Sequence, residues 1–377
     1  MKKIVFVNQS SGYLMTDIIN QYCEKYDEVV LVAGSIKRNA RKLNLKVKTQ
    51  KIISYNRDSV VKRLFTWLIG GFQIFFLLLF RYRNHEVFYV TNPPVAYLSQ
   101  LLLKYKYYLL IYDVFPDALK NTGIAESHFL YKLWSRWNKK IFPGAVQVFT
   151  IGQSMKLLLS KYVTAEKIKV IPNWSASDEF RPVPKDENPF IQKHNLQNKF
   201  VVMYSGNIGL THCVEVLVDA ANILKHDKEI VFLVIGEGKK KPELLSRADE
   251  NKLDNCLFLS WQDAEMLKWS LAAADIGVVT LNEATAMLSV PSKTYNLMAV
   301  GASVLAIAPD NCELADILNT YKNGKIFISS QTQEIALFIQ MCKSDREYLS
   351  IMSANSLKAS ANFTYKNAEQ YLLIDDL

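Results

Sequence analysis

Residues 290–309 read Val-Pro-Ser-Lys-Thr-Tyr-Asn-Leu-Met-Ala-Val-Gly-Ala-Ser-Val-Leu-Ala-Ile-Ala-Pro, and this stretch contains several structural signals in succession. Residues 291–293 form a polar turn that leads into a predicted helix over 294–300. Gly301 ends this helix in the manner of a C-terminal cap. The apolar run 303–308 has the length and composition of a fully buried parallel strand. This order of turn, helix, cap and strand is typical of an α/β protein.

The turn before this helix is a candidate anion-binding site. The first backbone N–H groups of a helix have no partner inside the helix and carry the positive end of its macrodipole. Ser292 and Lys293 add a hydroxyl and a cation at the same point. Together these groups suit a phosphate. The alternative is an ordinary loop with a solvated lysine, and the stretch alone does not decide between the two.

The size and charge of the chain limit its class. With 377 residues it exceeds the size at which a single core stops growing, so two domains are expected. Half of the residues are hydrophobic and 21% are charged, which is enough for two cores and gives no sign of disorder. The net charge of +9 suits an anionic partner, which would be a nucleic acid, a phosphorylated substrate or an acidic membrane surface.

The cysteines indicate neither a zinc site nor a disulfide framework. All five are widely scattered, and no CxxC or Cys/His cluster occurs. This fits a reducing, cytosolic compartment. The apolar run after Met1 is too short for a signal peptide and is expected to form the first strand of a sheet.

The chain repeats a strand–helix alternation in two successive series. The predicted strands are 4–7, 29–33, 47–53, 86–90, 107–112, 146–151 and 168–171 in the first series, and 200–204, 230–235, 257–259, 275–280 and 303–308 in the second. A polar, proline-bearing segment at 175–196 separates the two series and is expected to be a linker. We therefore predict an α/β fold of two doubly wound Rossmann-like domains facing a central cleft.

The predicted boundaries follow from this alternation. We expect residues 1–185 to form an N-terminal domain and residues 186–355 to form a C-terminal domain. Residues 356–377 form a C-terminal helix that packs back on the N-terminal domain.

Residues 64–80 are an apolar segment at the short limit for a membrane-spanning helix. Its flanks are basic on both sides, with Lys62, Arg63, Arg81 and Arg83. Gln73 and the Gly70–Gly71 pair make a spanning helix less favourable. The segment also lies where a doubly wound fold needs a crossover helix. We expect a buried or interfacial helix here rather than a transmembrane one.

A second segment, residues 128–142, interleaves aromatic and basic residues. Helical spacing gathers Phe129, Leu133 and Trp137 towards one face. Such a helix either packs on a core with a solvated basic side or lies in an anionic membrane interface. No nucleic-acid motif accompanies it, so nucleic-acid binding is not expected.

Two residues of the N-terminal half lie where open α/β sheets bind ligands. Asp113 follows the predicted strand 107–112, and Gly12 follows the first strand. A turn or helix-cap aspartate and a plain turn glycine are the alternatives. The first turn lacks G-x-G-x-x-G, which argues against a dinucleotide oxidoreductase.

Four segments together resemble the GT-B glycosyltransferases of glycosyltransferase family 4. They are Ile168-Lys-Val-Ile-Pro-Asn-Trp174, Tyr204-Ser-Gly-Asn-Ile-Gly209, Ala273-Ala-Asp-Ile-Gly277, and Pro291-Ser-Lys-Thr-Tyr with Met298-Ala-Val-Gly301. They occur in the order of the family and cover residues 146–309 well. The stretch Asp113-Val-Phe-Pro-Asp117 is similar to an Asp-x-Trp-Pro-Glu pattern of enzymes that build bacterial capsule, O-antigen or exopolysaccharide.

The resemblance implies a donor site in the C-terminal domain. A nucleotide-sugar diphosphate would be approached by the loop residues Gly206, Asn207 and Gly209. Ser292 and Lys293 would bind it from the other side, with Lys293 offsetting the charge of the leaving nucleotide. The nucleotide would lie near Glu237 and Gly238, and its ribose near Asn296.

On the acceptor side, the resemblance implies that Asp113 faces the reacting sugar or the acceptor hydroxyl, with Gly12 and Asp117 close by. One departure concerns the two glutamates, eight positions apart, that the family often carries. Leu288 and Asn296 occupy these positions, and Glu283 lies nearby but out of register. Asn296 can bond a ribose hydroxyl but without the assistance of a charge.

The resemblance therefore predicts a retaining, metal-independent glycosyltransferase whose donor sugar is carried by UDP, the commonest carrier in the family. Its acceptor would be a lipid-diphosphate-linked saccharide of bacterial surface polysaccharide synthesis. Its place would be cytoplasmic and peripheral, at the anionic inner face of the cell membrane. No acidic D-x-D pair occurs near Gly206 or Lys293 to hold a metal. A nucleotide-sugar 2-epimerase and a non-catalytic nucleotide-sugar-binding subunit are the alternatives.

Overall fold

A computed structural model gives the structure of the chain and describes all residues except 38–40, 57, 210–211, 287–289 and 373–377. The chain forms two compact units. Unit 1 comprises Met1–Ala176 and Tyr365–Leu377, and unit 2 comprises Ser177–Thr364. The division after residue 176 differs from the predicted one after residue 185.

The reason for this difference lies in the predicted linker, most of which is folded onto unit 2. Asn188 Oδ1 accepts hydrogen bonds from the backbone N–H groups of Phe190 and Ile191 and so caps a short helix. Its Nδ2 donates to the carbonyl oxygen of Trp269 at 2.9 Å. Phe190 and Ile191 are fully buried. Prolines and polar residues therefore mark an ordered edge of unit 2 rather than a free linker.

Unit 1 is built on a parallel sheet. Its strands are β1 (Lys3–Val7), β2 (Ser10–Ser11), β3 (Glu28–Ala33), β4 (Ser35–Ile36), β5 (Val47–Lys51), β6 (Glu86–Val90), β7 (Tyr107–Ile111), β8 (Gln147–Thr150) and β9 (Ile168–Val170). Among the described residues, the main sheet has the order β5-β3-β1-β6-β7-β8-β9, and β2 pairs with β4. The order reverses between β1 and β6, which is the switch point where a doubly wound sheet binds ligands.

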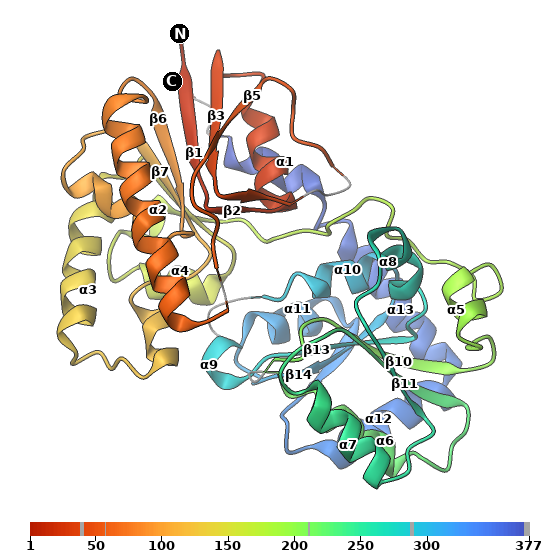
Figure 1. Cartoon of the computed structure of the whole chain (residues 1–377). Coiled ribbons are helices and arrows are strands. Elements are labelled where there is room, and N and C mark those ends of the chain that lie inside the picture. The colour runs from red at the N-terminus through yellow and green to blue at the C-terminus, as the bar shows by residue number, and fades with distance from the viewer. Residues whose placement is uncertain (38–40, 57, 210–211, 287–289, 373–377) are drawn as a thin grey trace. The chain divides into compact units, whose positions relative to one another are not determined.

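Helices cover both faces of this sheet (Figure 1). They are α1 (Tyr13–Tyr22), α2 (Val60–Phe80), η1 (Ala96–Leu101), η2 (Asp117–Thr122), α3 (Phe129–Ile141), η3 (Phe142–Gly144), α4 (Gln153–Leu159), η4 (Ala165–Lys167) and η5 (Tyr365–Tyr371). The elements α2, η1, α3 and α4 contribute to one core with the sheet. On the other face, Phe6 contacts Tyr22 of α1, and Phe149 contacts Tyr371 of η5.

The helix α2 packs on the sheet by one narrow stripe. Ser59 caps its start by accepting a hydrogen bond from the N–H of Lys62. Its buried residues are Thr66, Gly70, Ile74 and Leu78. By length and composition α2 could cross a membrane, and only 22% of its most apolar window is buried. Of the two expected alternatives, the buried helix is therefore wrong, because the outward side of α2 remains exposed and apolar. The interfacial helix stays a prediction.

The exposed side of α2 carries large hydrophobic side chains. Phe65 is 59% exposed, Phe72 64% and Phe80 74%. In α3 the residues that face the core are Tyr131, Asn138 and Ile141, and Phe129 at its start is exposed.

Unit 2 repeats the same plan. Its strands are β10 (Phe200–Ser205), β11 (Ile230–Ile235), β12 (Cys256–Leu259), β13 (Ile276–Thr280), β14 (Ser303–Ile307) and β15 (Gly324–Phe327). The parallel order is β12-β11-β10-β13-β14-β15, with its switch point between β10 and β13. The helices are α5 (Pro189–Lys193), α6 (Glu215–Ile223), α7 (Lys241–Glu250), α8 (Ala264–Leu271), α9 (Glu283–Ala286), α10 (Lys293–Ala299), α11 (Glu313–Tyr321), α12 (Thr332–Ser344) and α13 (Arg346–Ser360).

The predicted cap at Gly301 is confirmed. Gly301 has φ +76°, which only glycine adopts freely. Its N–H donates to the carbonyl of Met298, and the N–H of Ala302 donates to the carbonyl of Leu297. This pair of bonds is a Schellman motif. It turns the chain from α10 directly into β14, so the position of Lys293 at the start of α10 is fixed by the sheet.

The C-terminal segment differs from the predicted helix 356–377. Residues up to Ser360 belong to α13 of unit 2, and η5 returns to unit 1. There Tyr22 Oη donates a 2.7 Å hydrogen bond to the carbonyl of Tyr371. The side chain of Tyr371 is fully buried.

Candidate functional site

Three loops of unit 2 meet at the carboxyl ends of β10, β11 and β13. The backbone N–H of Gly206 donates to the carbonyl oxygen of Ile235, and the N–H of Ile208 donates to the carbonyl oxygen of Glu237, both at 2.9 Å. Gly236 has φ +142°, and a Cβ there would lie 1.9 Å from the carbonyl oxygen of Gly206. The close contact between these two loops therefore requires glycine at position 236.

The contact between these two loops at Gly206 and Gly236 is called the lysine junction, because Lys293 reaches it from the first turn of α10. A Cβ on Gly206 would lie 2.6 Å from Lys293 Nζ, so the ammonium lies directly against the glycine backbone. The Nζ atom also lies over the ring of Tyr204, 3.9 Å from the ring centroid. It is inaccessible to solvent and has no hydrogen-bond partner among the described residues. The loop after β10 and the start of α10 thus form one site.

The burial of Nζ changes its protonation. Desolvation lowers the pKa of Lys293 from its usual 10.5 to about 7. Burial, followed by the charge of Lys293, lowers the pKa of His212. An anion placed beside Nζ would favour the charged form of Lys293 and raise its pKa again.

The other predicted donor residues lie in the loop after β10, in the loop after β11 and on α10. Asn207 is exposed, and Tyr204 Oη donates to its carbonyl oxygen at 2.7 Å. A Cβ on Gly209 would lie 2.7 Å from Asn207 Nδ2. Ser292 is exposed at the N-terminus of α10, and Asn296 lies one turn further along that helix.

Glu237 and Gly238 lie in the loop after β11. Glu237 is exposed and accepts a hydrogen bond from Lys241 Nζ at 2.7 Å, which lowers the pKa of the carboxyl. A Cβ on Gly238 would lie 2.2 Å from the carbonyl oxygen of Ile208. Leu288 lies outside the described residues, and Glu283 is exposed at the start of α9.

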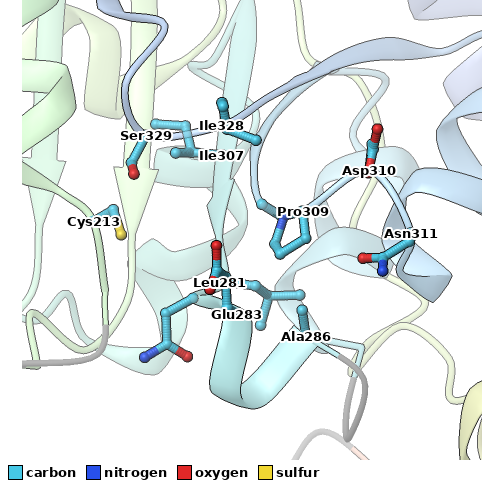
Figure 2. A pocket seen from close by; sticks show the side chains of 12 residues that line it. Cys213, Leu281, Glu283, Ala286, Ile307, Pro309, Asp310, Asn311, Ile328 and Ser329 are labelled. Atoms are coloured by element: carbon cyan, nitrogen blue, oxygen red, sulfur yellow. The ribbon is translucent and has the colours of Figure 1, made fainter.

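A cavity of about 740 Å³ opens at the carboxyl ends of β13, β14 and β15. Its lining residues are Cys213, Leu281, Asn282, Glu283, Ala286, Ile307, Ala308, Pro309, Asp310, Asn311, Ile328 and Ser329. In the view of Figure 2, Cys213 and Ser329 lie on one side of the cavity, and Asp310 and Asn311 on the other. One of the lining residues, Cys213, directly follows His212, whose pKa is lowered by burial and then by the charge of Lys293.

A second, smaller cavity lies in unit 1 at the switch point between β1 and β6. Its volume is about 250 Å³, and its lining residues are Asn8, Ser10, Gly12, Tyr13, Leu14, Met15, Val90, Thr91, Asn92, Tyr112 and Asp113. Asp113 is exposed, and its backbone N–H lies 3.3 Å from Thr91 Oγ1. The structure thus brings Gly12 and Asp113 to the same cavity, although they are far apart in the sequence.

Asp117, predicted on the acceptor side, is buried instead. Its Oδ1 accepts hydrogen bonds from Tyr131 Oη at 2.9 Å and Lys161 Nζ at 2.8 Å, and Lys120 lies 3.1 Å away. Burial alone would raise the pKa of this carboxyl, but these donors outweigh it and lower the pKa. Asp117 therefore joins η2, α3 and the segment after α4, and offers no open carboxylate to a ligand.

Comparison with known proteins decides the family. Residues 186–359, nearly all of unit 2, match the family model described as "Glycosyl transferases group 1". Residues 186–359 therefore form a group 1 glycosyltransferase domain. Its predicted membership of glycosyltransferase family 4 and its predicted enzymatic class are confirmed.

Two relatives of this glycosyltransferase have similar sequences over most of its length. A protein of Pseudomonas aeruginosa described as "Probable glycosyltransferase WbjE" is 29% identical over 271 residues, which are 70% of this chain and 68% of the relative. A protein of Escherichia coli K12 described as "Putative colanic acid biosynthesis glycosyl transferase WcaI" is 28% identical over 233 residues, or 60% of this chain and 57% of the relative.

The crystal structure of HepE from Anabaena in complex with UDP and glucose shares the fold of the glycosyltransferase. The TM-score is 0.74 at 16% sequence identity, with 98% of each chain covered. The prediction of two doubly wound Rossmann-like domains of GT-B type is confirmed. The prediction that these domains face a common cleft stays a prediction.

Tyr204 and His212 are the residues near Lys293 that the sequence did not single out. Tyr204 belongs to an apolar strand, where nothing in the local pattern distinguishes a ring that contacts a lysine. His212 lies three positions after Gly209, and its proximity to Lys293 depends on the path of the loop after β10.

Proposed function

We propose that this glycosyltransferase transfers a sugar from a nucleoside diphosphate donor, carried by UDP, to a lipid-diphosphate-linked saccharide. The reaction would be retaining and independent of metal, and it would serve the synthesis of a bacterial surface polysaccharide. The names of WbjE and WcaI and the UDP bound by HepE support this choice of class and donor. The transfer would take place at the cytoplasmic face of the membrane.

The observation that carries this proposal is the environment of Lys293. A buried ammonium without an acidic partner is costly, so a fold that keeps one in place requires a reason. A donor diphosphate beside Gly206 would supply the missing negative charge. During transfer this charge grows on the leaving nucleotide, and an ammonium already in position would stabilise it.

The nucleoside and the sugar of the donor would lie on opposite sides of the lysine junction. The nucleoside would lie over the loop after β11, with Glu237 and Gly238, and Asn296 would bond its ribose. The sugar would extend into the cavity of 740 Å³, where Glu283 and Asp310 supply carboxylates for its hydroxyl groups. Charged hydrogen bonds of this kind orient a sugar strongly.

The acceptor would occupy the cavity of unit 1. Its hydroxyl would face Asp113, which is exposed and can accept a hydrogen bond from it. Gly12 at the same cavity leaves open space, because nothing lies within 4 Å of the place of a Cβ.

The exposed side of α2 would place the enzyme on the membrane. Aromatic rings such as those of Phe65 and Phe80 favour the interface of a bilayer, and the basic residues Arg81 and Arg83 after the helix favour anionic headgroups. In vesicle flotation we expect binding to anionic vesicles that falls with rising salt. Glutamate in place of both Phe65 and Phe80 should abolish it, and binding that survives this double change would contradict a role for α2.

The test of the function is transfer from UDP-sugars to a lipid-diphosphate-linked saccharide in excess EDTA. Retained activity with EDTA supports the proposal, and complete loss contradicts metal independence. Conversion of the donor without any acceptor would indicate a 2-epimerase. Calorimetric binding of UDP-sugars without transfer across a panel of acceptors would indicate a binding subunit.

A further inference from the structure

An apolar groove runs along the exposed side of α2. Its volume is about 280 Å³, and its lining residues are Leu68, Gly71, Phe72, Phe75, Phe76, Val95, Ala96, Leu98, Ser99 and Leu102. At the groove α2 approaches the segment before η1 closely, since a Cβ on Gly71 would lie 2.7 Å from Val95 Cγ2. A cleft of this composition in a water-exposed surface suits a hydrocarbon chain.

Two unpaired donors continue the same helical row. Arg63, Trp67, Gly71 and Phe75 are spaced four apart, so they lie on one face of α2. Arg63 Nε and Trp67 Nε1 are both buried and have no hydrogen-bond partner in the part of the chain that the structure describes. The guanidinium of Arg63 lies 5.4 Å from the centroid of the Trp67 ring.

The position of these donors is fixed by packing. The Trp67 ring is stacked on Tyr55 at 5.9 Å and contacts the edge of Phe115 at 5.7 Å. Gln9, which follows Asn8 of the unit 1 cavity, donates from Nε2 to the carbonyl oxygen of Thr66 at 2.8 Å. Thr66, next to Trp67, is thus bonded to a neighbour of the cavity that holds Asp113, and the row of Arg63 and Trp67 continues along α2 into the apolar groove.

We propose that the groove holds the hydrocarbon chain of an isoprenoid-type lipid diphosphate and that Arg63 and Trp67 bind its diphosphate. Buried N–H donors without acceptors would be stabilised by a bound anion, and a guanidinium forms strong charge-assisted hydrogen bonds to phosphate. The apolar residues of α2 that follow them in the groove would bind a hydrocarbon chain attached to that anion. The cavity on the other side would then receive the sugar that the diphosphate carries. This inference rests on the proposed function, because it specifies the acceptor.

The test is calorimetric binding of farnesyl diphosphate to the full chain, without membranes and with excess UDP present to occupy the donor site. We expect saturable binding of farnesyl diphosphate and at least tenfold weaker binding of inorganic diphosphate, which lacks the chain. Arg63→Gln should weaken farnesyl diphosphate binding about tenfold or more, because a charge-assisted bond is lost. Lys62→Gln is its control, since the neighbouring Lys62 is exposed and lies 3.3 Å from Asp58.

A second matched pair tests the groove. Leu68 lines it and is 55% exposed, and Leu64 lies one turn earlier outside it and is 46% exposed. Both substitutions to glutamate replace an exposed leucine and should leave the melting temperature nearly unchanged. We expect Leu68→Glu to weaken farnesyl diphosphate binding at least tenfold and Leu64→Glu to leave it unchanged.

Several outcomes would overturn the inference. Equal losses from Leu68→Glu and Leu64→Glu would mean that the ligand only adsorbs to the helix surface. Equal binding of inorganic diphosphate would mean a simple phosphate site, and an unchanged affinity in Arg63→Gln would remove the headgroup contact. If UDP still stabilises the chain while farnesyl diphosphate does not bind, this inference fails and the proposed donor remains. If UDP does not bind, the proposed function itself fails.

Discussion

The replacement of Lys293 by methionine tests the burial of its ammonium directly. Methionine keeps an unbranched side chain of similar length but has no charge to desolvate. Nζ lies over Tyr204 and against Gly206 without a hydrogen-bond partner, so little other than the charge is lost. We expect Lys293→Met to make the unliganded chain more stable at neutral pH and to prevent tight binding of UDP.

The magnitude follows from the two pKa values of Lys293, about 7 in the folded chain and 10.5 for an ordinary lysine. Since the folded value is the lower one, the folded state binds fewer protons between these pH values, and stability rises with pH. Each tenfold change in an equilibrium constant is worth ~1.4 kcal/mol, so the penalty for burying the amine is ~4 kcal/mol at pH 7 and ~2 kcal/mol at pH 9. The stability gained by Lys293→Met should shrink by ~2 kcal/mol over this range.

Differential scanning calorimetry of both proteins between pH 7 and pH 9 measures this change. Where two unfolding transitions are seen, the one to compare is the transition that UDP moves to a higher temperature in the wild type, because the proposed UDP site lies in unit 2. For a domain of this size 1 kcal/mol corresponds to ~2–4 °C, so the difference in melting temperature should narrow by ~4–8 °C. Lys239→Met, which removes an exposed lysine of the loop after β11, should show no such dependence on pH.

Two results would refute the reasoning. A difference between wild type and Lys293→Met that stays constant from pH 7 to pH 9 would mean that the amine does not titrate in this range. A variant less stable than the wild type at pH 7 would mean that Lys293 has a stabilising anionic partner already. With saturating UDP the wild type should gain more stability than the variant, because the diphosphate supplies the partner that the amine lacks.

Three further predictions concern single side chains. Gly206→Ala should raise the dissociation constant of UDP at least tenfold, because a Cβ would lie 2.6 Å from Lys293 Nζ; Gly12→Ala, with open space at its Cβ, is the control that should leave calorimetric UDP binding unchanged. Asp113→Asn should lower kcat by ~10²–10⁴ with an unchanged KM for the donor, and steady-state kinetics with a normal kcat would remove Asp113 from catalysis. Asp117→Asn should cost ~1–3 kcal/mol of unfolding free energy in urea at pH 7 by weakening its bonds to Lys161 and Tyr131. Because the folded pKa of Asp117 is lowered, this difference should fade as the pH falls below the usual 3.8 of the carboxyl, and a loss of the same size in acid would contradict the assignment.

The sequence by itself determined the fold class and the places where loops leave the sheets. Strands such as β14 are apolar runs, and the turn at Gly301 is set by the local need for a positive φ. Such features depend on neighbouring residues only, and a sequence pattern records them. The same holds for Gly206 and Lys293, which follow strands at positions where a doubly wound sheet brings its loops together.

Only the tertiary structure decided how these residues are surrounded. Lys293 Nζ is buried by Tyr204 and Gly206, which are nearly ninety positions earlier in the chain, and this burial produces its lowered pKa. Asp117 and Asp113 are four residues apart and equally acidic, yet one is paired inside unit 1 and the other lines a cavity. The pattern of one segment does not contain this difference, because burial and pairing are set by contacts between distant segments that exist only in the folded chain.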